Sequence, residues 1–193
     1  MKKSEFQTDL VSKPLSILTS KWVLERIPSI FGTDSQGYIE WKEQLASGLR
    51  VDSRAMLITG SASCGFSLSP WKEYRDFDSD SDIDVALVSQ RHFDLSWHAL
   101  RTLGPRLYSL TPKQRTDVQN HVERLIYWGT IAADKILPVL PFAKEWNTAL
   151  ENAAGNSPID GREVKVRIYR DFESLKSYQV TNFEKLRDAL ILQ

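Results

Sequence analysis

Residues 56–88 constrain the fold of this chain more strongly than any other segment. An apolar strand runs into a turn that begins with Gly60 and Ser61, and a second apolar strand follows a long polar loop. The second strand opens with Asp82 and Asp84. Because successive side chains of a strand point to opposite faces, the two aspartates share one face and leave the other face apolar. The segment therefore predicts two strands of a sheet that presents paired carboxylates near a Gly-Ser turn.

Paired carboxylates on a rigid strand predict a cation site, because their mutual repulsion is costly unless a cation offsets it. Oxygen ligands suit Mg²⁺ or Mn²⁺, and Mg²⁺ usually takes one or two carboxylates together with substrate phosphates. Gly60 has no Cβ, so the backbone N–H groups and the hydroxyl of the Gly60-Ser61 turn can approach such phosphates. Asp82 and Asp84 are thus candidate metal ligands in a site that holds a nucleoside triphosphate. An acidic strand edge without a metal is the alternative.

The motif resembles the signature of the nucleotidyltransferase superfamily of the DNA polymerase β type. The resemblance is carried by Gly60-Ser61 with Gly65, followed by Ser-Asp-Ile-Asp-Val at residues 81–85. The superfamily includes the minimal nucleotidyltransferases, the aminoglycoside nucleotidyltransferases and the bacterial cyclic-oligonucleotide synthases. The resemblance covers about a sixth of the chain, and residues 66–80 form a longer connection than the family usually has.

The resemblance implies an α+β fold, with a small mixed β-sheet and flanking helices. It implies that Asp82 and Asp84 are catalytic metal ligands and that Gly60, Ser61 and Gly65 bind the nucleotide. The activity that it implies is the transfer of a nucleoside monophosphate from a nucleoside triphosphate to an unidentified hydroxyl acceptor, with Mg²⁺ or Mn²⁺ as the cofactor.

The family also has a third acidic residue on a later strand, and its counterpart in this chain is open. Residues 163–170 alternate as a strand should, but their polar face offers Lys165 and Arg167 where an acid is expected. Glu163 is in phase with them and stands at the start of the strand. Asp171 lies past the end of the strand and out of phase, and Asp134 in the preceding helical segment is a further alternative.

Two functions follow from these alternatives. If Glu163 completes the catalytic site, the protein is an active nucleotidyltransferase. If Lys165 and Arg167 face the cleft instead, they bind phosphate. The protein is then a catalytically weak or inactive nucleotide-binding or partner-regulating protein that has kept the fold. The resemblance leaves the acceptor open, and it makes a protein partner and a role in bacterial defence or in a toxin–antitoxin pair further options.

Composition limits these options. A chain of 193 residues, 41% of them hydrophobic, suits one domain with a substantial core. Its formal net charge is zero, so nucleic acid is a possible partner that the overall charge does not favour. Cys64 is the single cysteine, which excludes an internal disulfide framework and a cysteine-rich zinc site. Without a signal peptide or an apolar run of membrane-spanning length, we expect a cytoplasmic protein without membrane contact.

The domain is expected to comprise several units along residues 1–193. The units are N-terminal helices in residues 1–50, the motif strands in residues 51–90, a helical segment in residues 91–155, and a strand with a C-terminal helix in residues 162–193. Residues 1–13 are polar and are expected to be a loose arm or a first helical turn. Apolar spacing after a cap at Thr111 predicts a helix that continues to Ile131.

The inserted segment, residues 66–80, contains the aromatic residues Trp71, Tyr74 and Phe77. One interpretation is that these rings stack on a nucleobase or a polynucleotide. The other is a surface loop that is pinned in place by its aromatic side chains.

Overall fold

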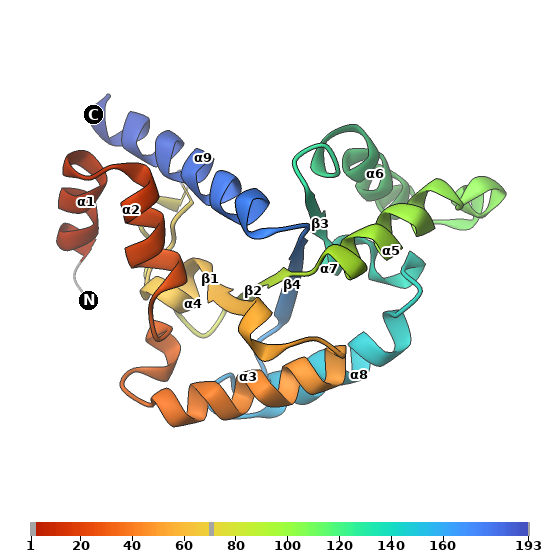
Figure 1. Ribbon diagram of the computed structural model, residues 1–193, viewed down its shortest axis with the longest axis horizontal. Helices are drawn as coiled ribbons and strands as arrows, with labels where there is room; N and C mark the ends of the chain where they lie inside the picture. The colour runs from red at the N-terminus through yellow and green to blue at the C-terminus, as the bar shows by residue number, and fades with distance from the viewer. Residues whose placement is uncertain (1–2, 70–71, 193) are drawn as a thin grey trace.

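The protein folds around a four-stranded mixed sheet, which a computed structural model describes for residues 3–69 and 72–192 (Figure 1). The strands, in their order across the sheet, are β1 (Met56–Thr59), β2 (Ile83–Val88), β4 (Val164–Tyr169) and β3 (Thr130–Ala132). β1 is antiparallel to β2, β2 is parallel to β4, and β4 is antiparallel to β3. The predicted α+β fold with a small mixed sheet and flanking helices is confirmed.

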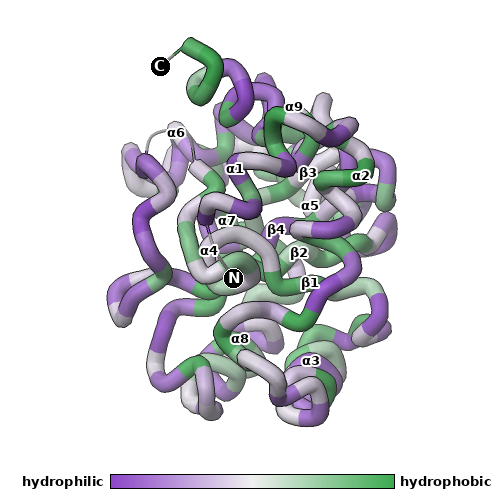
Figure 2. The backbone as a smooth tube through the Cα atoms, turned by 90° about the vertical axis from the view of Figure 1, so that its left-hand side faces the viewer, coloured by the Kyte–Doolittle hydropathy of each residue, from purple (hydrophilic) through white to green (hydrophobic). Residues whose placement is uncertain are grey.

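Helices cover the sheet from two sides. The α-helices of the described chain are α1 (Lys3–Ser12), α2 (Leu15–Thr19), α3 (Ser35–Leu49), α4 (Gly60–Cys64), α5 (Gln90–Arg101), α6 (Pro112–Asn120), α7 (Ala133–Ile136), α8 (Ala143–Gly155) and α9 (Phe172–Ile191). Figure 1 shows α3 and α8 packed together on one side of the sheet and α1, α2 and α9 on the other. The same separation is visible in Figure 2, which is turned by 90°. No helix in the described part of the chain is long and apolar enough to cross a membrane.

The strand alternation predicted from the sequence is confirmed. Ile83, Val85 and Leu87 of β2 are at most 1% exposed, and the side chains at positions 164, 166 and 168 of β4 are also buried. Burial of this apolar face stabilises the sheet, at about 25 cal/mol for each Å² removed from water. The acidic pair is consequently left on the opposite face, where it is free to take part in a site.

The N-terminal residues are a buried helix, so the expectation of a loose arm or a single first turn is wrong. Phe6 and Leu10 of α1 are fully buried, and Phe6 lies 5.0 Å from Trp22 and 5.6 Å from Phe183 between ring centroids. The partners of these apolar residues come from distant parts of the chain. Because residues 1–13 are mostly polar, the local sequence pattern does not predict this helix.

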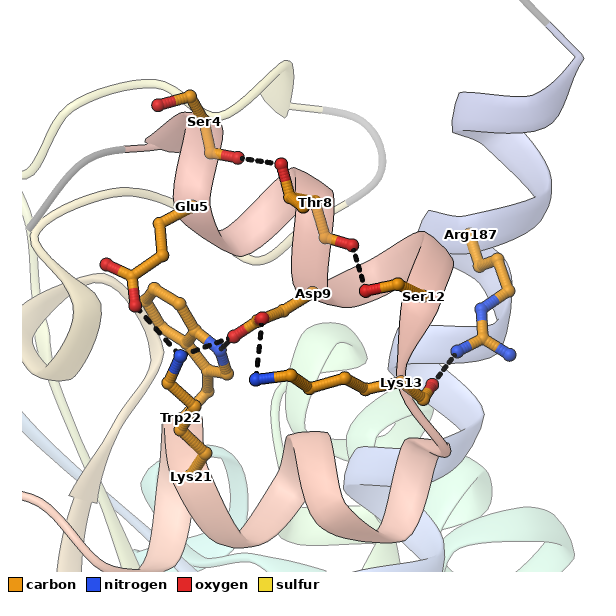
Figure 3. Close-up of polar contacts among 9 residues, drawn as sticks. All are labelled: Ser4, Glu5, Thr8, Asp9, Ser12, Lys13, Lys21, Trp22 and Arg187. Atoms are coloured by element: carbon orange, nitrogen blue, oxygen red, sulfur yellow. Dashed lines mark hydrogen bonds and ion pairs between the residues drawn. The ribbon is translucent and has the colours of Figure 1, made fainter.

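Asp9 fixes α1 to the following helical segment (Figure 3). Its Oδ2 accepts hydrogen bonds from Lys21 Nζ at 2.6 Å and from Trp22 Nε1 at 3.0 Å, and its Oδ1 lies 2.8 Å from Lys13 Nζ. Burial by itself raises the pKa of Asp9, but these hydrogen bonds outweigh it and hold the pKa well below its usual range. Arg187 of α9 donates to the carbonyl oxygen of Lys13, which ties the end of α1 to α9.

The predicted helix does not continue from Thr111 to Ile131, and the helical segment 91–155 is interrupted by a strand. α6 passes into a π-helical turn, His121–Leu125, and β3 follows at Thr130–Ala132. The buried His121 accepts a hydrogen bond from the N–H of Ala132 at 3.1 Å, which anchors the strand to the preceding turn. Gly129 has a φ of +65°, so it makes the bend between them at little cost. The apolar residue Ile131 belongs to the sheet.

The inserted segment is held by its aromatic side chains. Tyr74 packs between ring systems of the core, 6.0 Å from Phe6 and 6.2 Å from Phe66 between centroids. Phe77 is half-buried against the main core, and the guanidinium of Arg162 lies 5.3 Å from its ring centroid. The structure thus has the pinned loop rather than base-stacking rings at Tyr74 and Phe77. Trp71 lies outside the described residues.

Candidate functional site

The Gly-Ser turn links the end of β1 to the short helix α4. Gly60 has a φ of +64°, which favours glycine, and a Cβ built on it would lie 2.7 Å from Oδ2 of Asp84. The β1–β2 pairing places Thr59 opposite Asp84, so the turn and the acidic strand are held side by side. Only glycine at position 60 allows this close approach of the turn to the carboxylate.

Asp82 and Asp84 line a cavity of about 440 Å³ together with Gly60 and Ser61. The side chain of Asp82 is 43% exposed. Asp84 opens into the cavity, yet the protein atoms around it desolvate its carboxylate, and the charge of Asp82 acts in the same direction. Both effects raise the pKa of Asp84. The positive charges of Arg167 and Lys165 only partly offset this rise in the pKa of Asp84. The pair therefore has the electrostatic character of a cation site.

Two cationic side chains of β4 reach the same cavity. Lys165 pairs in register with Asp84, and its Nζ lies 2.5 Å from Oδ2 of Asp82 and 3.3 Å from Oε2 of Glu163. Burial lowers the pKa of Lys165, but the hydrogen bonds to Asp82 and Glu163 outweigh it and raise the pKa above its usual value. The guanidinium of Arg167 lies 5.0 Å from the ring centroid of Tyr178. The cavity therefore combines the carboxylates of Asp82, just before β2, and Asp84, within β2, with cations on β4.

The structure brings Asp134, rather than Glu163, to the cavity of the acidic pair. Asp134 belongs to α7, its side chain is 17% exposed, and its charge contributes to the raised pKa of Asp84. Glu163 is 66% exposed and lines a neighbouring depression together with Asp134 and Lys165. No side chain of β4 supplies a carboxylate opposite Asp84, because the paired position carries Lys165.

Gly65 ends α4 and takes no part in lining the cavity. Its φ is +83°, and its N–H donates to the carbonyl oxygen of Ser61 at 2.8 Å. A Cβ at this position would lie 2.9 Å from the hydroxyl oxygen of Ser29. Gly65 thus positions the turn that carries Ser61, whereas a direct contact with a nucleotide stays a prediction.

Several residues around the cavity were not identified from the sequence. They are Tyr178, Gln179 and Asn182 of α9 and Ser67 and Lys72 of the inserted segment. A signal existed for α9: Gln179 and Asn182 are polar residues spaced three apart, so they lie on one face of a helix. Gln179 is only 7% exposed. Their amide groups give the cavity hydrogen-bonding capacity beyond the charged groups.

The acidic pair offers oxygen donors of the kind that a divalent cation prefers. Asp82, Asp84 and the hydroxyl of Ser61 are hard oxygen donors of the kind that Mg²⁺ and Mn²⁺ prefer. Across residues 3–69 and 72–192, no three Asp, Glu, His or Cys side chains are grouped so that they could hold a metal ion. Mg²⁺ usually takes one or two carboxylates and completes its coordination with oxygens from water or from a bound phosphate.

Comparison of this chain with protein-family models, with curated proteins and with solved structures found no match. The resemblance to the nucleotidyltransferases accordingly rests on the residues of the motif alone and stays a prediction.

Proposed function

We propose that the cavity binds a nucleoside triphosphate with Mg²⁺ or Mn²⁺, and that the protein is a nucleotidyltransferase that moves a nucleoside monophosphate to a hydroxyl acceptor. The observation that supports this proposal is the convergence of Gly60, Ser61, Asp82 and Asp84 on one cavity. Packing alone does not require this combination. Gly60 leaves room for the carboxylate of Asp84, and desolvation raises the pKa of that carboxylate, so its ionised form is unfavourable in the fold. We further propose a fold of the DNA polymerase β type, since the turn and the acidic pair lie on adjacent antiparallel strands.

In this proposal each group has a separate task. Asp82 and Asp84 would hold the cation, which neutralises phosphate charge and activates the acceptor hydroxyl when it is bound. The backbone N–H groups and the hydroxyl of the Gly60-Ser61 turn bind phosphate oxygens. Lys165 and Arg167 bind the triphosphate and stabilise the negative charge of the departing pyrophosphate.

A nucleotide-binding protein with weak or no catalysis is the second candidate. The ion pair of Lys165 with Asp82 favours it, because an ammonium stands on the strand where the resembled family has its third acid. Lys165 and Arg167 can bind a triphosphate without supporting a second cation.

A transfer assay separates the two candidates. The protein is incubated with a γ-³²P-labelled nucleoside triphosphate, Mn²⁺ and a mixture of hydroxyl acceptors, and released labelled pyrophosphate is measured. An enzyme releases pyrophosphate, and Asp82→Asn and Asp84→Asn each lower the rate at least a hundredfold. Triphosphate binding without pyrophosphate release would support the second candidate. A protein that shows no triphosphate binding and no pyrophosphate release would contradict both candidates.

A further inference from the structure

A second cavity of about 580 Å³, which shares no lining residue with the first, lies between α5, the segment before β3 and the start of α9. We call it the aromatic groove. Its aromatic residues are Phe93, Trp97, Tyr127 and Trp128, its charged residues are Asp94, Arg170, Asp171 and Glu173, and Ile126, Gly129, Ser174 and Ser177 complete it. None of these residues takes part in the candidate nucleotide site.

The aromatic groove exposes large rings to water. Tyr127 is 82% exposed, Trp128 is 61% exposed and Trp97 is 39% exposed. Such a concentration of exposed rings is unfavourable for a free surface and typical of an interaction site. The rings of Tyr127 and Trp128 meet edge to face with centroids 5.2 Å apart, so each ring stabilises the orientation of the other in the unbound protein.

The charge of the aromatic groove indicates which partner it suits. Asp94, Asp171 and Glu173 supply three carboxylates, whereas Arg170 is the cation of the lining and already lies 4.0 Å from Asp171. One indole on this surface already carries a cation, because the guanidinium of Arg101 lies 4.6 Å from the ring centroid of Trp97. Rings rimmed by carboxylates attract ammonium and guanidinium groups through both the ring faces and the charges.

We propose that the aromatic groove binds an extended, cationic segment of a partner protein, with Arg or Lys side chains against the exposed rings of Tyr127 and Trp128 and near Asp94 and Glu173. Nucleic acids and anionic lipid surfaces are disfavoured, since the three carboxylates outnumber the guanidinium groups of Arg170 and Arg101 at this surface. This inference does not depend on the proposed nucleotidyltransferase activity, because the two cavities are lined by different residues.

The test uses fluorescence anisotropy with a fluorescein-labelled peptide of four Arg-Gly repeats and a matched peptide of four Glu-Gly repeats. The full chain should bind the cationic peptide and not the acidic one. The exposed rings can be removed with little risk to folding, so Tyr127→Ala/Trp128→Ala should weaken binding about tenfold. Glu173→Lys should weaken it by a similar factor without removing a ring.

Two variants serve as matched controls. Tyr108→Ala removes a side chain that is also 82% exposed but lies outside the groove, and Glu151→Lys reverses an exposed charge on α8. Both should bind the cationic peptide like the wild type. Absence of peptide binding, equal binding of the acidic peptide, or equal losses in the control variants would overturn the proposal. Self-association that disappears in Tyr127→Ala/Trp128→Ala would also overturn it, because the occupant would then be a second copy.

Discussion

Lys165 Nζ lies 2.5 Å from Oδ2 of Asp82, so an ion pair joins the two neighbouring strands that carry the candidate site. The ammonium group neutralises part of the charge that a divalent cation would otherwise offset. Because Lys165 also lies where a phosphate can reach it, the arrival of a triphosphate would give the ammonium an alternative partner and release Asp82. Cation and triphosphate should therefore bind together rather than independently.

Replacing this lysine should have opposite effects on the two ligands. Lys165→Met leaves the repulsion between Asp82 and Asp84 without its resident cation, so Mn²⁺ alone should bind several-fold more tightly. A triphosphate with Mn²⁺ should bind about tenfold more weakly, because one charge-assisted hydrogen bond is lost. Both affinities are measured by calorimetry, with Lys144→Met on the exposed surface of α8 as the control. Unchanged affinity for Mn²⁺ alone would exclude a role of Lys165 as the resident cation.

Gly60→Ala should damage both the fold and the site. The added Cβ would lie 2.7 Å from Oδ2 of Asp84, and the φ of +64° is unfavourable for alanine. We expect a loss of about 1–3 kcal/mol in the free energy of unfolding, measured in urea. Gly155→Ala is the control, because Gly155 is helical, has no positive φ and has open space around its Cβ position. Alanine at position 155 should be neutral or slightly stabilising, and equal losses at both positions would contradict the steric argument.

The raised pKa of Asp84 predicts a pH-dependent gain in stability when its charge is removed. Ionised Asp84 is less favourable in the folded than in the unfolded protein. The protein is therefore relieved of this cost at low pH, and the cost appears as pH rises through the pKa of the folded state. Asp84→Asn should be more stable than the wild type near pH 7 and lose this advantage as the pH falls to about 4. Urea unfolding without metal at both pH values checks this, and a constant difference would contradict it.

Asp9 should behave in the opposite way, because its pKa is lowered in the folded protein by Lys13, Lys21 and Trp22, against the effect of burial. Its ionised form stabilises the fold at pH values above the usual carboxyl range, and this contribution is lost as the pH falls toward the pKa of the folded state. Asp9→Asn should lower the melting temperature by several degrees at pH 7, with a smaller effect at acidic pH. An effect that grows on acidification would contradict the network shown in Figure 3.

The local pattern of the sequence predicts the parts of the fold that depend on near neighbours. The alternation around Ile83 and Val166 predicts β2 and β4, and the spacing of apolar residues predicts α9. The Gly60-Ser61 turn and the placement of Asp82 and Asp84 on one face also follow from local rules. The coarse organisation of the candidate site can therefore be predicted from the sequence alone.

The remaining features depend on contacts between distant segments. Only the parallel pairing of β2 with β4 shows that Lys165 faces the acidic pair. Asp134 reaches the cavity because β3 replaces the end of the helix that the sequence predicts as far as Ile131, and α7 follows directly after β3. That difference has a physical cause: the buried His121 anchors a three-residue strand whose apolar residues also suit a helix. Helix and strand cannot be separated by periodicity in so short a segment.

The central claim is that Asp82 and Asp84 bind a triphosphate together with a divalent cation. Its most direct test is calorimetric titration of each of the four ribonucleoside triphosphates, with Mg²⁺, into the wild type and into Asp82→Ala/Asp84→Ala. Glu145→Ala/Glu151→Ala is the control, since it removes two exposed carboxylates of α8. We predict that at least one triphosphate binds the wild type and the control, and that this binding disappears in Asp82→Ala/Asp84→Ala. Absence of binding to the wild type, or undiminished binding to Asp82→Ala/Asp84→Ala, would contradict the claim.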